Sequence, residues 1–436
     1  MSGPRVAIIG GGVAGITAAL DCADRGASVT LLEVRPRLGG AAYSFERDGL
    51  TLDNGQHVFL RCCSEYRALL ERIGGAGGVE LQQRLEIPVL APGQPPALLR
   101  RSSLPAPAHL TGALLRYRHL SLRERLAVAR AALAIGRVDP AADDETLGAW
   151  LERHGQSERA IANLWDLIAL PTLNLPAADA ALGLGAFVFQ EGLLSSAGAG
   201  DIGIHRAPLS EIIGEPAIEA LAGAGVEVRL RWRAKAVEQR QSRFAVQSES
   251  DELDADAVIV AVPHTRAAAL VPAALEQTTG WAQALGTSPI INVHVVYDRR
   301  VLDHQFAAGV DSPVQYVFDR TPPAWNDARQ YVAISLSAAY AESRMRPDEL
   351  RERYLPALAE LLPRAAGAEV LRFALTREHA ATFRAAPGTR ALRPAAATTL
   401  PGFALAGAWT ATGWPATLEG AARSGHAAAN VVLDAG

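Results

Sequence analysis

Three glycines and one carboxylate near the start of the chain have the types and spacing needed to bind a dinucleotide. Gly10, Gly12 and Gly15 follow an apolar stretch, and Glu33 comes 23 residues after Gly10. The first glycine permits a tight turn, the second lets the backbone approach a pyrophosphate, and the third lets a helix pack closely on its strand. A carboxylate at this distance can accept hydrogen bonds from ribose hydroxyls. Together these residues predict a site for the ADP half of a dinucleotide.

The elements around these residues have the order that such a site requires. Residues 5–9 are typical of a buried strand, the glycines lead into a helix, and residues 28–33 predict a second strand that ends on the acid. This order brings the N–H groups and positive dipole of the helix N-terminus to the phosphates. The alternative, a glycine-rich turn without a ligand, leaves Glu33 and the adjacent glycines unexplained.

Two further glycine-containing segments favour FAD over NAD. Gly39 and Gly40 stand where an NAD-dependent dehydrogenase would normally continue with another strand–helix unit, and they let backbone amides approach a longer ligand. Near the other end, a strand runs into Gly407 and a helix begins near Thr417. Its free N–H groups suit the flavin pyrimidine ring, which gains negative charge on reduction. The small residues of that helix (Gly420, Ala421, Ser424, Gly425) equally suit close helix packing.

Composition limits the class of protein. The 436 residues predict two or three domains, and a net charge of −4 gives no electrostatic footprint for nucleic acid. The three cysteines suit a reducing compartment. No signal peptide is visible, and no apolar run approaches the roughly 20 residues of a spanning helix. We expect a cytoplasmic protein without a metal site, at most peripheral on the inner face of the cell membrane.

Secondary-structure patterns predict an α/β fold built from two discontinuous domains. A Rossmann-type nucleotide-binding domain comprises residues 1–85, 205–265 and 385–436, and an inserted α+β substrate domain with a helical part comprises 86–204 and 266–384. The expected helices beyond the first are 114–137, 146–168, 347–362 and 418–433. The expected later strands are 49–60 (interrupted at 53–57), 225–237, 244–248, 257–263, 290–297, 314–318, 331–337 and 403–407.

Over essentially its whole length the chain resembles the amine oxidase and phytoene desaturase superfamily of FAD proteins. It is most similar to the hydroxysqualene dehydroxylases in the segments 53–60, 164–167, 172–174, 288–294 and 412–417. This resemblance implies reductive removal of the hydroxyl from hydroxysqualene, a C30 isoprenoid, giving squalene and oxidised flavin in hopanoid biosynthesis. No second glycine fingerprint for NAD(P)H follows a strand, so an external electron donor is expected.

The resemblance also implies a set of cofactor-binding residues. Ala41 stands where many relatives carry an arginine, and Ala408 stands where many carry an acid, so backbone contacts must hold more of the cofactor. Val237 matches the position whose backbone holds the adenine. The predicted cofactor-binding residues are Gly10, Gly12, Val13, Ala14, Gly15, Glu33, Arg35, Gly39, Gly40, Ala41, Asn54, Gly55, Val237, Gly407, Ala408, Trp409, Ala416 and Thr417.

Removal of a hydroxyl requires an acid, while reduced flavin delivers hydride in a dry, apolar pocket. His57 is the preferred proton donor because imidazole titrates near neutral pH. Gln56 can orient water or substrate, whereas Asp53 either orients His57 or is structural. The competing interpretation is that residues 54–57 only satisfy backbone groups at a strand bend. Weaker acid candidates are His205 and Asp201, and Phe59, Trp409 and Trp414 either line the pocket or pack in the core.

Residues 114–137 combine leucines with arginines, a pattern that fits either an anionic membrane surface or an ordinary solvated helix. Two other functions stay open at this point. One is an oxidative reaction on the same scaffold, as in a carotenoid-type desaturase or an amine oxidase. The other is a non-enzymatic carrier of prenyl lipids, against which the intact glycines and Glu33 argue.

Overall fold

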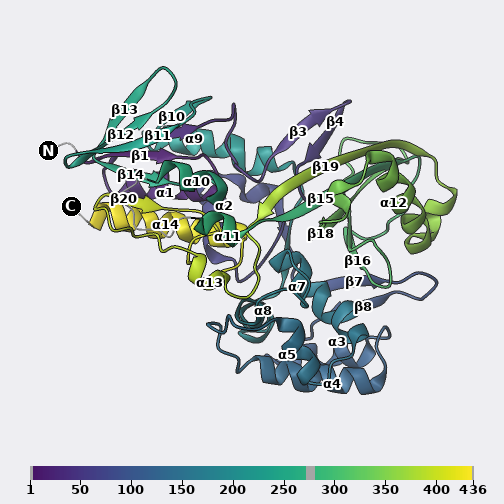
Figure 1. The fold of residues 1–436 in the computed structure, drawn as a ribbon. Helices are drawn as coiled ribbons and strands as arrows, with labels where there is room; N and C mark the ends of the chain where they lie inside the picture. Colours follow the sequence, from purple (N-terminus) through teal and green to yellow (C-terminus); the bar gives the residue numbers. More distant parts are fainter. Residues whose placement is uncertain (1–2, 272–279, 435–436) are drawn as a thin grey trace.

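The computed structural model describes residues 3–271 and 280–434, and a parallel sheet lies at the upper left of Figure 1. Five strands lie in the order β10-β2-β1-β14-β20. Apolar runs such as Ala257–Val260 form these strands because both faces of a parallel sheet are covered. Their bounds are β1 Arg5–Ile9, β2 Ser28–Glu33, β10 Glu227–Leu230, β14 Ala257–Val260 and β20 Phe403–Leu405. The predicted α/β class is confirmed.

Two helices from opposite ends of the chain cover this sheet side by side. They are α1, Val13–Asp24, and α14, Leu418–Asp434, which Figure 1 shows in purple and yellow. A side chain at Gly425 would overlap the backbone carbonyl of Ala14, so only glycine permits this close approach. Gly425 therefore serves helix packing. Nearby helices are α2 Ser64–Ile73, α9 Glu215–Gly223, α10 His264–Leu270, α11 Trp281–Leu285 and α13 Thr389–Leu392.

A second, mainly antiparallel sheet contains seven strands in the order β19-β15-β18-β17-β16-β7-β8. Helix α12, Pro347–Leu361, packs its apolar face on this sheet. The strand bounds are β7 Glu86–Leu90, β8 Ala97–Arg100, β15 Ser288–Tyr297, β16 Phe306–Gly309, β17 Tyr316–Asp319, β18 Gln330–Ser337 and β19 Val370–Thr382. In Figure 1, the long strand β19 arches from this sheet back towards the parallel one.

A helical part lies along the lower edge of Figure 1. The predicted helix 114–137 is interrupted, because Tyr117 is extended and buried and its hydroxyl donates to the carbonyl of Asn163. Ser121 then caps a new helix by accepting from the N–H of Glu124. The predicted helix 146–168 is interrupted as well. The helices are α3 Thr111–Arg116, α4 Leu122–Ile135, α5 Leu147–Arg153, α6 Glu158–Ala160, α7 Asp166–Leu173 and α8 Leu182–Phe189.

Two predicted strands each split between different sheets. Residues 225–237 form β10 and β11 rather than one strand, because Arg231 adopts a φ of +58° and the chain turns there. Residues 49–60 likewise divide into β4 and β5. The smaller sheets contain β3 Ser44–Arg47 with β4 Leu50–Asp53, then β5 Val58–Leu60, β6 Val79–Leu81 and β9 Ile202–His205, and finally β11 Ala236–Arg240, β12 Arg243–Gln247 and β13 Glu252–Ala255.

Every strand of the parallel sheet falls within residues 1–85, 205–265 and 385–436, and every strand of the seven-stranded sheet falls within 86–204 and 266–384. The antiparallel strand β9 spans the boundary at residue 205 and pairs with β5 and β6. We retain the division into two discontinuous domains as a proposal.

Candidate functional site

The two glycine loops predicted to hold the cofactor lie against each other at the end of β1. The N–H of Gly39 donates to the carbonyl of Gly11 at 2.9 Å. A Cβ on Gly40 would lie 2.7 Å from the Cα of Gly12, and one on Gly10 would lie 2.5 Å from the carbonyl oxygen of Ala261. No side chain fits in these contacts, so backbone atoms form the cradle.

The acid predicted for the ribose closes the cradle from β2. Glu33 is 6% exposed, and its two carboxylate oxygens accept from the N–H groups of Gly11 and Arg35, each at 2.7 Å. Each oxygen retains a second lone pair for a ribose hydroxyl. The residues present therefore fit the ADP half of FAD. Val237 lies on β11, and its predicted role at the adenine stays a prediction.

The C-terminal segment begins at the same edge of the sheet. Ile9, Val260 and Leu405 are in register on neighbouring parallel strands, so the chain leaves all three towards the same side. The N–H of Gly407 donates to Ser424 Oγ at 2.8 Å. Thr417 caps α14 by accepting from the N–H of Gly420 at 3.1 Å, which confirms the predicted start of the helix.

The aromatic candidates pack mainly within the protein. The indole N–H of Trp409 donates to the carbonyl of Val262 at 2.9 Å, and its ring packs on Trp281. Phe59 packs against Tyr66 and His205, with ring centroids 5.5 Å apart in each case. Core packing therefore accounts for Trp409 and Phe59. Trp414 lies edge-on to Phe187 and beneath the guanidinium of Arg423.

Asn54 joins the predicted cofactor segment to the seven-stranded sheet. Its side chain accepts from the N–H of Tyr43 and donates to the carbonyl of Ala41 at 2.9 Å and to Glu378 Oε1 at 3.0 Å. Its carbonyl accepts from Asn292 on β15 and from Thr376 on β19. The segment 54–57 is thus held between the glycine loops and the middle of two long strands.

His57 is half-buried, and its Nδ1 lies 3.1 Å from the carbonyl oxygen of Gly55. Because a carbonyl only accepts, Nδ1 carries a proton, and Nε2 of the neutral ring has only a lone pair. Burial lowers the pKa of His57, and the Gly55 carbonyl and Asp53 only partly offset this effect. His57 can therefore donate a proton from Nε2 only in its imidazolium form.

Asp53 makes structural contacts and no hydrogen bond to His57. Its carboxylate accepts from Ser44 Oγ at 2.6 Å, from the N–H of Leu209 at 3.1 Å and from Arg320 at 2.5 Å. The side chains of Asp53 and Arg320 are only 4% and 13% exposed. Arg320 also donates to the carbonyl of His205. The observed bonds match the structural alternative for Asp53.

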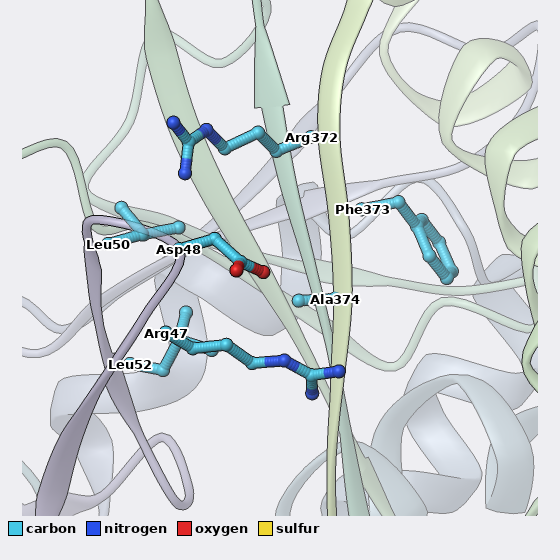
Figure 2. A pocket seen from close by; sticks show the side chains of 7 residues that line it. All are labelled: Arg47, Asp48, Leu50, Leu52, Arg372, Phe373 and Ala374. Carbon is cyan, nitrogen blue, oxygen red and sulfur yellow. The ribbon is translucent and has the colours of Figure 1, made fainter.

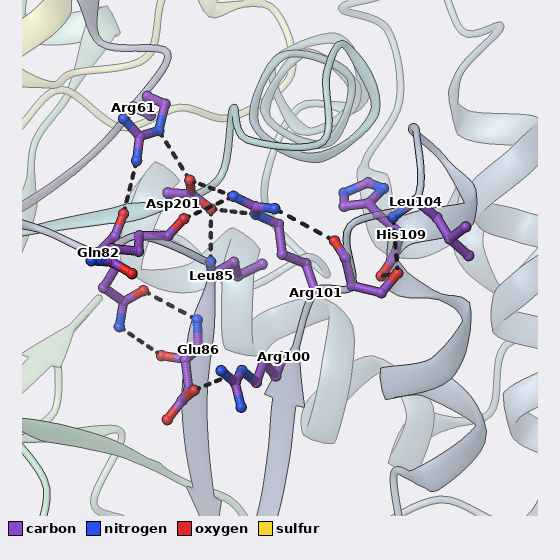
Figure 3. Close-up of polar contacts among 11 residues, drawn as sticks. Arg61, Gln82, Leu85, Glu86, Arg100, Arg101, Leu104, His109 and Asp201 are labelled. Carbon is purple, nitrogen blue, oxygen red and sulfur yellow. Dashed lines mark hydrogen bonds and ion pairs between the residues drawn. The ribbon is translucent and has the colours of Figure 1, made fainter.

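The two weaker acid candidates are internal. Figure 3 shows Asp201, fully buried, with its carboxylate bound by Arg61, Arg101 and the N–H of Leu85. Burial would raise the pKa of Asp201, but hydrogen bonds from Arg101 and Arg61 outweigh it and keep the pKa below its usual value. Burial lowers the pKa of His205 to about 3, and both of its ring nitrogens are occupied, by the His57 carbonyl and the Tyr66 hydroxyl.

Sequence reasoning missed several polar residues at this junction. The hydroxyl of Tyr43 lies 3.3 Å from Glu378 Oε1, and the guanidinium of Arg37 stacks 3.5 Å from the centre of the Tyr43 ring. Asn292 Oδ1 and Nε2 of Gln56, which was a predicted site residue, are buried without a hydrogen-bond partner among the described residues. An asparagine within the apolar stretch 288–297 was a usable signal. Glu378 had no such signal in the sequence, because strand β19 was not predicted.

A separate pocket of about 250 Å³ lies between the β3–β4 hairpin and β19 (Figure 2). Arg47, Asp48 and Arg372 surround it together with apolar groups, and Leu52 on its wall directly precedes Asp53. None of the predicted site residues lines this pocket.

The comparisons with known proteins agree on the scaffold. A family model described as flavin containing amine oxidoreductase matches residues 13–433. Hydroxysqualene dehydroxylases of Sinorhizobium fredii and Rhodopseudomonas palustris are 27% and 28% identical, over 98% and 99% of both chains. A probable zeta-carotene desaturase of Synechococcus elongatus is 23% identical over 99% of each chain. A solved putrescine oxidase bound to putrescine shares the fold, with a TM-score of 0.72, 19% identity and 99% coverage of each chain.

Proposed function

The chain belongs to the family of flavin containing amine oxidoreductases, and on that premise we propose that it catalyses the FAD-dependent reductive dehydroxylation of hydroxysqualene to squalene. It is an FAD-dependent oxidoreductase, so the non-enzymatic carrier is set aside. The supporting observation is full-length similarity to hydroxysqualene dehydroxylases. Two segments of that resemblance, 53–60 and 288–294, meet where Asn292 donates to the carbonyl of Asn54.

In this proposal each group has a defined task. Bound FAD, reduced by an external donor, supplies the hydride that replaces the hydroxyl. The Gly10–Gly12 and Gly39–Gly40 loops and Glu33 hold its ADP half. The imidazolium of His57 protonates the leaving hydroxyl from Nε2, because Nδ1 is bound to Gly55. The substrate thus gains a C–H bond and releases water, and Gln56 lies next to His57 to orient the hydroxyl.

The decisive experiment is a single turnover without oxygen. Enzyme reduced with dithionite is mixed with hydroxysqualene, and squalene is measured by mass spectrometry while the flavin spectrum is followed. We expect one squalene for each flavin that is reoxidised. Flavin that stays reduced, with no squalene formed, would overturn the proposal. The similarity to a zeta-carotene desaturase favours an oxidative reaction as the second candidate, and reduction of the oxidised enzyme by a carotene would support it.

We also propose that this cytoplasmic enzyme takes its lipid substrate from the inner face of the cell membrane, through residues 114–137. No helix among the described residues is long and apolar enough to cross a bilayer. Helix α4 buries Val128, Ala131 and Ile135. With 3.6 residues per turn, Leu122, Leu126 and Leu133 lie on the opposite face, and they are 68%, 61% and 59% exposed. This helix therefore carries a second apolar stripe that faces solvent.

The charge around this leucine stripe favours an anionic bilayer as its occupant. Residues 104–138 contain six arginines and one acid, whereas the whole chain carries a net charge of −4. Arg116, Arg118, Arg123, Arg130 and Arg137 are exposed. A second copy of the chain fits poorly, because a symmetric contact would set arginines against arginines. Leucines that enter the headgroup boundary between arginines match the pattern of interfacial helices.

Sedimentation with lipid vesicles tests this surface. The wild-type protein should bind vesicles that contain phosphatidylglycerol and not pure phosphatidylcholine vesicles. The double variant Leu126→Glu/Leu133→Glu should bind about tenfold less, because it loses apolar contact and gains repulsion. Leu371→Glu, at an exposed leucine on β19, is the matched control and should bind normally. Equal vesicle binding by the double variant and the wild type would reject the proposed membrane surface. A wild-type protein that binds an acidic protein but no vesicles would also reject it.

A further inference from the structure

Arg393 is a buried cation at the base of the loop that joins β20 to α14. It is 7% exposed and follows the short helix α13. No described carboxylate forms an ion pair with it, since nearby Asp143 accepts from the backbone N–H of Arg390 instead. Its guanidinium lies 4.8 Å from the centre of the Phe383 ring. Such a cation requires polar compensation from another source.

Backbone carbonyls of the 407–417 loop supply that compensation. Nη2 of the guanidinium lies 3.2 Å from the carbonyl oxygen of Ala408, 2.5 Å from that of Thr410 and 2.8 Å from that of Trp414, and Nε donates to the carbonyl of Trp409 at 3.4 Å. The hydroxyl of Thr412 lies 3.3 Å from the same Nη2, so the two hydrogens of this nitrogen are shared among four acceptors. One side chain thus fixes the positions of four carbonyls across seven residues of loop. The planar fork of arginine can reach several acceptors at once, whereas a lysine ammonium is a single compact charge.

The ends of this loop are residues for which cofactor contacts are predicted. Gly407 begins it at the edge of the parallel sheet, and Thr417 ends it as the cap of α14. Within it lie Ala408 and Ala416. The side chains of Ala408 and Ala416 have no polar group, so any hydrogen bond from these two residues to a ligand must come from the backbone. The contacts of Arg393 with this backbone stabilise its conformation.

We propose that Arg393 is a positioning residue for FAD, which holds the 407–417 loop in its cofactor-binding conformation and whose positive charge favours the reduced, anionic flavin. Burial lowers the pKa of Arg393 to about 10, so the side chain stays charged at neutral pH. A fixed positive charge stabilises negative charge that develops nearby in a water-poor site. The proposal rests on the FAD dependence of the family and not on the identity of the substrate.

Two substitutions distinguish the effect of the hydrogen bonds made by the Arg393 guanidinium from the effect of its positive charge. Arg393→Lys keeps the charge and loses most of the carbonyl contacts, while Arg393→Met loses both. Arg390→Met, three residues earlier and exposed, removes a surface charge as the matched control. FAD affinity is measured by titrating the apoprotein with FAD and following flavin fluorescence. The midpoint potential of the bound flavin is measured against a reference dye at pH 7.

We expect both Arg393 variants to bind FAD at least about tenfold more weakly than the wild type. We expect a more negative flavin potential in Arg393→Met and a wild-type potential in Arg393→Lys, a difference that a purely structural role would not produce. Wild-type FAD affinity in Arg393→Lys would overturn the positioning role. An equal potential in all variants would overturn the role of the charge. If Arg393→Met does not fold, Arg393→Gln replaces it. None of these measurements involves hydroxysqualene, so they stand apart from the test of the reaction.

Discussion

Replacing His57 with glutamine is expected to slow dehydroxylation by about a hundredfold or more, the usual scale for loss of a general acid. FAD content should not change, because the cradle contacts involve Gly11, Gly39 and Glu33 rather than the imidazole. Turnover is measured with excess hydroxysqualene and a chemical reductant, and flavin absorbance reports FAD content. His304→Gln, at an exposed histidine on the surface, is the matched control.

The pH profile provides a second test of the same role. Burial lowers the pKa of His57 from its ordinary value of 6.5, so most of the population is neutral at pH 7. The imidazolium fraction grows as pH falls, and the wild-type rate should therefore rise below pH 6.5. The His57→Gln variant should lack this rise. Near-normal turnover of the variant, or the same profile in both proteins, would show that another group donates the proton.

Arg320→Met is expected to lower the free energy of unfolding by about 3–5 kcal/mol, because it leaves the Asp53 carboxylate buried without its cation. The double variant Asp53→Asn/Arg320→Met should recover much of this loss, since no uncompensated charge remains. Urea denaturation of the FAD-loaded protein measures both. Arg300→Met removes an exposed arginine paired with Asp319 and should cost about 0–1 kcal/mol.

The Asp53→Asn variant distinguishes the two roles considered for this residue. A structural Asp53 predicts loss of stability, with turnover per folded, FAD-loaded molecule near that of the wild type. An Asp53 that orients His57 predicts the opposite, namely normal stability and slow turnover. The absence of a hydrogen bond between the two side chains leads us to expect the first result.

Local patterns predicted the elements that depend on local sequence. The unit 5–33 and the helix 418–433 match β1, α1, β2 and α14 within a residue or two, because glycine turns, apolar runs and a threonine cap act over short distances. The predicted strand 225–237 was wrong because alternation continues through Arg231, where a single positive φ turns the chain into another sheet. β19 was missed because its mixed composition shows neither alternation nor an apolar run.

The site was predictable where one motif contained all the partners. Gly39, Gly40 and Gly12 meet as their spacing from the first strand suggested. Arg320 was out of reach, because it lies 267 residues from Asp53 on a loop without a motif. Glu378, 324 residues from Asn54, was equally hidden. A sequence motif shows that Asp53 has a carboxylate but not which residue binds it. The sequence therefore left two roles open for Asp53, orienting His57 or stabilising the structure.

The position of β20 in the parallel sheet affects how the protein is made. β20 covers the edge of β14, and α14 supplies Ser424 to Gly407 and Glu419 to the N-terminus of α2. These groups are synthesised after the glycine loops and Glu33, which form the rest of the cradle. A nascent chain on the ribosome therefore displays an open strand edge, the kind of surface that invites aggregation, until residues 403–434 emerge. The full cofactor site therefore forms only after residues 403–434 have been synthesised.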